Sequence, residues 1–286
     1  MVKRLVFGFF LFSFLTAGFF MASQQPVRAA DSKEKKVSET QEKSDSDEAV
    51  ESEGGDEAET KEADVPPLYL AEAKGEVFVI HKGDKKKADP PQKVEGDDKI
   101  VTGKDGKAYL QFQAGGTVEV GPQSEVKVSK LEIDPKTFKV RFQIALGKMK
   151  TILKKLTQSS SSFEIEAGGV VAGVRGTTFE VDYNKAKNEV ATKTYEGSVF
   201  TRVGGKEKIV EKGFSLVVGK SGVPVLSALT GSDVTDFVEF LDASNDLEKQ
   251  KEIIIKHLQK KLIDDITKKA LDKSGVKSPL DLQFHF

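Results

Sequence analysis

Few residues in this chain are of the kinds that perform chemistry, and their spacing argues against a catalytic centre. The three histidines stand far apart at positions 81, 257 and 285, and there is no cysteine. Zinc and copper sites need several such ligands at short spacing, so we expect no metal site and no cofactor. Neither a G-x-S-x-G nucleophile elbow nor a phosphate-binding P-loop occurs. The sequence therefore predicts a protein that is not an enzyme.

Asp97 and Asp98 are neighbouring carboxylates. Adjacent residues on a strand point to opposite faces, so we do not expect them to share a proton. We interpret both as solvated turn residues, with an acid/base pair as the alternative.

A basic cluster precedes the serine-rich loop at 158–162; it comprises Lys148, Lys150, Lys154 and Lys155. A solvated face explains these lysines, and contact with an acidic protein or an anionic cell-envelope polymer is the functional alternative. With four tyrosines and no tryptophan, the chain shows no aromatic and basic interleaving, so we expect no nucleic-acid partner. Arg175 stands in an apolar strand context, where its donors could bind backbone carbonyls at a corner between layers, or else a ligand.

The N-terminus is typical of an export signal. Lys3 and Arg4 precede an apolar run from Leu5 to Ala22, and Val27-Arg28-Ala29 suits signal peptidase. We expect residues 1–29 to be removed, leaving a periplasmic or secreted protein that does not insert into the membrane. An uncleaved inner-membrane anchor is the alternative, because the run approaches the length of a membrane span. Without cysteine, neither a lipid anchor at this signal nor a disulfide can form.

Residues 30–66 form an acidic segment that we expect to be a disordered linker. Positions 31–64 hold 14 acids and 5 bases and almost no branched apolar residue. Such a composition cannot bury enough apolar surface to offset chain entropy.

Residues 67–225 are predicted to form an all-β domain. Short runs alternate between apolar and polar residues at strand spacing; they cover 76–80, 107–112, 117–120, 138–146, 179–183, 189–194, 198–203 and 214–218. Asp105-Gly106, Gly115-Gly116 and Gly204-Gly205 are hairpin signals, and Gly75, Gly147 and Gly197 suit corners between sheet layers. The fold class predicted is mainly β: a layered β-sandwich or a solenoid-like domain, followed by a helical segment.

Residues 226–286 change to a helical pattern. We expect one helix capped by Ser232 and running to Leu241, and a second from about 245 to 273. The second should dock on the β domain, with a coiled-coil contact as the alternative. Residues 280–286 alternate like a short terminal strand. The oligomeric state is left open.

An ordered set of phrases in this β region resembles the FecR-domain family. The phrases are Gly75-Glu76-Val77 and those at 96–103, 106–112, 115–120, 174–181 and 196–199. The resemblance implies an all-β domain outside the cytosol, which in well-known relatives passes a signal from a receptor to a sigma factor. The positions that carry the motif, with structural roles expected, are Gly96, Asp97, Thr102, Gly103, Arg175, Gly176, Thr177, Phe179 and Gly197.

Two functions are compatible with this resemblance. Since only two residues precede Lys3, we expect no cytosolic anti-sigma segment. The first prediction is accordingly an exported binding or scaffold module of the FecR type that recognises a protein or a cell-envelope polymer. The alternative is a membrane-anchored FecR-like sensor or regulator in signal transduction.

Overall fold

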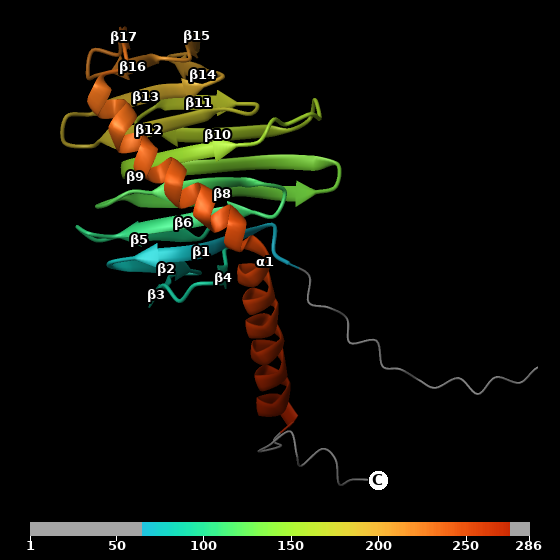
Figure 1. The fold of residues 1–286 in the computed structure, drawn as a ribbon. Coiled ribbons are helices and arrows are strands. Elements are labelled where there is room, and N and C mark those ends of the chain that lie inside the picture. Colours follow the sequence, from blue (N-terminus) through green and yellow to red (C-terminus); the bar gives the residue numbers. More distant parts are fainter. Residues whose placement is uncertain (1–64, 275–286) are drawn as a thin grey trace, which may run out of the picture. The chain divides into compact units, whose positions relative to one another are not determined.

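The structure is a computed structural model that describes residues 65–274, with side chains omitted at 266 and 270–274. In this described part of the chain, seventeen strands are followed by one helix, and Figure 1 shows their arrangement. The first strands are β1 (Leu68–Lys74), β2 (Val77–His81), β3 (Asp84–Lys87), β4 (Gln92–Lys93), β5 (Lys99–Thr102), β6 (Lys107–Phe112), β7 (Gly116–Val120), β8 (Glu125–Asp134) and β9 (Thr137–Leu153). The remainder are β10 (Ser162–Ala167), β11 (Val170–Val174), β12 (Thr178–Asn184), β13 (Glu189–Glu196), β14 (Ser198–Val203), β15 (Lys206–Glu211), β16 (Phe214–Val218), β17 (Pro224–Ala228) and helix α1 (Gly231–Ser274).

The predicted signal peptide at 1–29, nearly all of the predicted linker, and the predicted strand at 280–286 lie outside the described residues. Helix α1 has no stretch apolar and long enough to cross a membrane, and it is the one helix in residues 65–274.

The strands form two layers that share β9. Sheet A has the order β4-β1-β6-β7-β9-β12-β13-β16-β17, with every neighbouring pair antiparallel. Sheet B has the order β3-β2-β5-β8-β9-β10-β11-β14-β15, in which only β9 and β10 run parallel. The predicted mainly β, layered architecture with a C-terminal helical segment is confirmed.

Strand β9 passes from one layer to the other at Gly147. Residues before it pair with β8 and β10 in sheet B, and those after it pair with β7 and β12 in sheet A. Gly147 has φ 93°, which a residue with a side chain rarely adopts. A Cβ there would lie 2.1 Å from the Ser124 hydroxyl oxygen. The expectation of a glycine at a corner between layers is therefore confirmed at this position.

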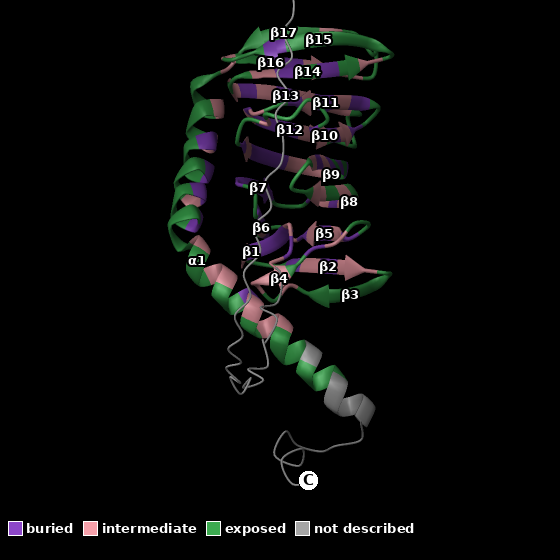
Figure 2. Cartoon of the chain, turned by 90° about the vertical axis from the view of Figure 1, so that its right-hand side faces the viewer, coloured by how far each residue is buried: buried purple, intermediate pink, exposed green. Residues whose placement is uncertain are grey.

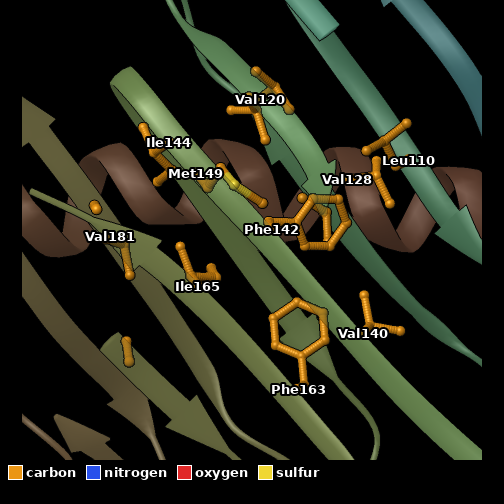
Figure 3. Close-up of a cluster of buried hydrophobic side chains, with 14 of the residues drawn as sticks. Leu110, Val120, Val128, Val140, Phe142, Ile144, Met149, Phe163, Ile165 and Val181 are labelled. Carbon is orange, nitrogen blue, oxygen red and sulfur yellow. The ribbon is translucent and has the colours of Figure 1, made fainter. Parts of the chain in front are cut away.

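The core lies between the two sheets (Figure 3). Phe142 and Phe163 of sheet B are fully buried, as are Met149 and Phe179 of sheet A. Ring centroids of Phe163 and Phe179 lie 6.2 Å apart in an edge-on arrangement that aromatic pairs prefer. This packing follows from the alternation of apolar residues along each strand.

Two of the three predicted hairpin turns are confirmed. Gly115-Gly116 joins the paired strands β6 and β7, and Gly204-Gly205 joins β14 and β15. Asp105-Gly106 instead connects β5 in sheet B to β6 in sheet A, so its assignment to a hairpin was wrong. A Cβ on Gly106 would lie 2.2 Å from the Glu76 carbonyl oxygen, so close packing at the corner accounts for this glycine.

The prediction of two C-terminal helices was wrong, because α1 is continuous. Residues 242–245 contain neither glycine nor proline, so nothing interrupts the backbone hydrogen bonds there. The cap is Thr230, two residues before the predicted Ser232. Thr230 accepts a bond from the Asp233 amide, while the Asp233 carboxylate accepts one from the Thr230 amide, which is a reciprocal capping arrangement.

Helix α1 lies against the outer face of sheet A, on the side opposite the core (Figure 2). Phe237 stacks on Tyr195 of β13 at 3.9 Å, and Lys261 binds Asp89 beside β4 near the other end of the sheet. Leu247 and Leu258 are buried between these points, so the expected docking of the helix on the β domain is confirmed for this part of α1.

Candidate functional site

A row of alternating charges crosses sheet A beneath α1; we call it the charge ladder. It consists of Glu119 of β7, Lys150 of β9, Glu180 of β12 and Lys193 of β13. Each residue stands directly opposite the next across neighbouring strands. Opposite charges facing each other across an antiparallel pair stabilise the pairing.

Strand alternation places the ladder on the helix side of sheet A. Phe179 and Val181 point into the core, so Glu180 between them points the other way. Glu119 and Lys150 are each 2% exposed and Glu180 is fully buried, because α1 covers this face. The ladder is thus a set of charges withdrawn from solvent rather than a surface patch.

Within the sheet the ladder is held by direct ion pairs. The Lys150 ammonium lies 3.6 Å from Glu119 Oε1, and the Lys193 ammonium lies 2.9 Å from Glu180 Oε1. Lys148, two residues before Lys150, lies 3.9 Å from the same Glu180 oxygen.

The first turns of α1 complete the network with two carboxylates. Asp236 lies 3.1 Å from the Lys148 ammonium and 3.3 Å from that of Lys150, which also donates to the Asp236 carbonyl oxygen at 2.7 Å. Asp233 lies 2.9 Å from the Lys193 ammonium. The lysines of the sheet are therefore neutralised in part by carboxylates of the helix.

The pKa values of these groups shift in opposite directions. Burial raises the pKa of Glu180, although Lys148 and Lys193 oppose that effect. Burial alone would also raise the pKa of Asp233, but hydrogen bonds from Thr230 and Lys193 lower it to about 2. The pKa of Asp236 is lowered as well, because Lys148 and Lys150 outweigh the effect of burial. At neutral pH the helix thus supplies two firmly charged carboxylates to the lysines of the sheet.

The network leaves some buried polar atoms without partners. Glu119 and Glu180 each have one carboxylate oxygen, Oε2, with no hydrogen-bond partner in the described structure. Unpartnered buried oxygens cost free energy, since water is lost and not replaced. The docked helix is therefore held by specific ion pairs, while the Oε2 atoms of Glu119 and Glu180 beneath it lack hydrogen-bond partners.

The four lysines predicted as a basic cluster do not form one exposed surface, and this is a correction. Lys148 and Lys150 contact α1, and Lys154 lies 3.2 Å from Glu248 of the same helix. Only Lys155 is exposed without a described ion pair. The physical reason is that β9 turns into sheet A at Gly147, which places the side chains of Lys148 and Lys150 under the helix.

The motif positions hold the β layers together. Arg175 donates to the carbonyl oxygens of Gln158 and Ser159, at 3.0 and 2.9 Å. Thr102, which is buried, donates to the Gly121 carbonyl oxygen at 2.6 Å. Thr177 donates to the Ser198 carbonyl oxygen at 3.0 Å, and Phe179 lies in the core.

Three of the motif glycines stand where the backbone conformation or close packing disfavours a side chain. Gly176 has φ 125° and Gly197 has φ 76°. A Cβ on Gly103 would lie 2.5 Å from a Glu76 carboxylate oxygen, whereas one on Gly96 would meet nothing within 4 Å.

Asp97 and Asp98 occupy different environments, which corrects the expectation of two solvated acids. Asp97 has an 81% exposed side chain and pairs with Lys127 at 2.7 Å. Asp98 is buried, lies 2.6 Å from His81 Nδ1 and accepts a bond from the Glu95 amide. The pocket beside this pair has a volume of about 310 Å³, and no serine, threonine or cysteine lines it. This constellation therefore stabilises the turn before β5 and offers no hydroxyl or thiol nucleophile. No group of three or more metal-ligating side chains occurs among the described residues.

Of the charge ladder, Lys150 was singled out in the sequence, whereas Glu119, Glu180 and Lys193 were missed. Strand alternation showed that Glu119, between Val118 and Val120, faces away from the core. Nothing in the sequence showed that Lys150 stands opposite it or that α1 covers both.

Comparison with known families gives a match to part of the β layers. Residues 98–200 match the family described as FecR protein. This part of the chain is therefore similar to the FecR family. It contains β7, β9, β12 and β13 with the whole charge ladder, whereas α1 lies outside it. The resemblance stated from the sequence is confirmed.

Among the solved structures that match are two of "a putative anti-sigma factor from Parabacteroides distasonis ATCC 8503". The first is 13% identical with a TM-score of 0.42 and covers 49% of this chain and 64% of its own. The second is 11% identical with a TM-score of 0.42 and covers 49% and 63%. This chain thus spans just under two thirds of the structures it matches. Among curated proteins, the comparison finds no match.

Proposed function

We propose that this chain is a signal-transducing regulator in which the FecR domain senses a protein partner and α1 passes the signal on. The family match supports a sensor role over the scaffold role that was our first prediction. The observation that carries the proposal is the way α1 is held: Asp233 and Asp236 of the helix are bound to lysines of the sheet.

The ion pairs between α1 and sheet A should hold the helix only weakly, so that it can leave the sheet. A buried ion pair contributes little net stability, because loss of hydration offsets the attraction between the charges. Unpartnered oxygens on Glu119 and Glu180 reduce that contribution further. A partner that binds the sheet or the helix better when they are apart could therefore shift the equilibrium with a modest difference in affinity.

The helix also carries groups that could make the output contact. Val234, Val238 and Leu241 follow each other at helical spacing and are 48%, 46% and 40% exposed. They belong to the same turns as Asp233 and Asp236, so release of these turns would change how the three side chains are presented.

We place this activity outside the cytoplasm, on the strength of the signal-like N-terminus. The first prediction, a module that binds a protein or an envelope polymer, is the second candidate. An anionic polymer is the less favoured ligand, because Lys148 and Lys150 are occupied by Asp236. A role that is not enzymatic agrees with the family match.

The test combines a charge reversal with two measurements. Asp236→Lys puts a cation beside Lys148 and Lys150, so the first turns of α1 should leave the sheet and their amides should exchange hydrogen faster. In the native host, a regulator with this substitution should change the transcript profile. Asp246→Lys is the matched control, because within residues 65–274 Asp246 pairs only with the exposed Lys249 of its own helix. Faster exchange with an unchanged transcript profile would leave the scaffold role standing and refute the regulator.

A further inference from the structure

The two sheets have four edge strands, and one of them differs from the others in charge. An edge strand exposes unpaired backbone groups, which proteins commonly protect with charged side chains. In sheet B, β3 consists of Asp84-Lys85-Lys86-Lys87, and β15 contains Lys206, Glu207, Lys208 and Glu211. In sheet A, β4 has only two residues, one of them Lys93. Strand β17 has no charged side chain at all.

Strand β17 is also apolar and open to solvent. Val225 is 61% exposed and Leu226 is 54% exposed, and Val223 just before the strand is 61% exposed. Its pairing in the described structure is with β16 alone. An uncharged, apolar edge of this kind is a template for an added strand.

We propose that β17 binds residues 280–286 of a second copy of this chain as an additional strand of sheet A. That segment has leucine or phenylalanine at every second position: Leu280, Leu282, Phe284 and Phe286. Such alternation is the pattern of a strand with one apolar face, which matches the apolar edge that β17 offers. The proposal is independent of the regulatory role.

Geometry excludes the same chain as donor. Helix α1 begins three residues after β17 and runs along sheet A past β4, where Lys261 meets Asp89 (Figure 1). Its 44 residues extend about 65 Å at 1.5 Å per residue. The twelve positions from 275 to 286 span at most about 40 Å when fully extended. The segment therefore falls short of its own β17 and can reach that of a neighbour.

The contact joins different surfaces of the two copies. Each chain would receive a strand at β17 and donate one beyond α1, so association would be head to tail and could continue from copy to copy. A symmetric dimer through two β17 strands is the competing arrangement.

Crosslinking of single-cysteine variants tests the contact directly, because the chain has no cysteine of its own. Ser227→Cys marks β17, Gln283→Cys marks the segment, and Ile209→Cys on β15 is the control for an exposed apolar edge. With a short bismaleimide, Ser227→Cys mixed with Gln283→Cys should give several-fold more crosslinked dimer than Ile209→Cys mixed with Gln283→Cys. Equal yields would overturn the proposal, and a larger yield from Ser227→Cys alone would favour the symmetric dimer instead.

Sedimentation of the full chain over a range of concentrations provides the second test. Leu226→Lys and Phe284→Lys should each abolish the rise in mass with concentration, whereas Ile209→Lys and Gln283→Lys should preserve it. Circular dichroism identical to the wild type would show that each variant is folded. A wild-type chain that stays monomeric at all concentrations would overturn the proposal.

Discussion

The Lys193 ammonium lies 2.9 Å from Asp233 Oδ1 and 2.9 Å from Glu180 Oε1, so one side chain joins helix α1 to the buried row of charges in sheet A. Glu180 and Asp233 raise the pKa of Lys193 although burial opposes its charge. The lysine is thus fixed in its charged form between a helix carboxylate and a sheet carboxylate.

Removing the charge of Lys150 should destabilise the protein strongly. Lys150→Met leaves the buried Glu119 carboxylate without its cation, and breaking a buried pair in this way costs about 3 kcal/mol. The free energy of unfolding, measured with urea, checks the change. Lys154→Met is the control, since the Lys154 side chain is 64% exposed and its pair with Glu248 should contribute less than about 1 kcal/mol.

A double substitution separates the lost cation from the lost packing. Lys150→Met combined with Glu119→Leu removes both charges, so most of the loss should be recovered. A double variant as unstable as Lys150→Met alone would contradict the assignment of the cost to an unpaired carboxylate.

Asp233 should make stability depend on pH in the acid range. Its pKa is about 2 in the folded chain against the ordinary 3.8. Its contribution is therefore complete above pH 3.8 and is lost as the pH falls through about 2. After allowance for screening by solvent, we expect about 1 kcal/mol.

Comparison with Asp233→Asn isolates this group. The difference in unfolding free energy between wild type and variant should be constant from pH 7 to about 4 and should shrink below that. Asp246→Asn should run parallel to the wild type. A difference that persists unchanged at pH 2 would exclude an electrostatic contribution from Asp233.

Gly147→Ala should be among the more damaging single substitutions in the sheets. The new methyl group would meet Ser124 at 2.1 Å in addition to the strain of φ 93°, and we expect a loss of about 3 kcal/mol. Gly205 has φ 79°, and a Cβ there would meet nothing within 4 Å. Gly205→Ala should therefore lower the free energy of unfolding by only about 1 kcal/mol, through backbone strain. Equal losses in thermal unfolding would show that the close approach of Ser124 is unimportant.

Export predicts a defined N-terminus for the mature chain. The Val27-Arg28-Ala29 sequence should direct cleavage after Ala29, so the intact mass of protein from the native envelope should correspond to a start at Ala30. Retention of residues 1–29 in a membrane fraction would indicate the anchored alternative. Recovery from the cytosol would contradict both.

The sequence predicted the layered β fold because alternation within one strand is local information. Phe138, Val140 and Phe142 face the core as their period-two spacing indicated. Strand β3 was missed because its side chains are all charged, and strands β10 and β11 were missed as well.

The candidate site could not be predicted in the same way. Glu119 and Lys150 are brought together by the register of β7 against β9, and Asp236 approaches Lys150 from more than eighty positions away. Register and helix docking depend on long-range packing, which no window of residues contains. The lysines of β9 were noticed, yet their partners belong to three other elements.

Strand β9 is covalently part of both sheets, with the change at Gly147. A mechanical force applied to one sheet is therefore transmitted to the other through main-chain bonds and not only through side-chain contacts. The two sheets should therefore unfold in one cooperative step, whether unfolding is caused by denaturant or by force applied to one of them.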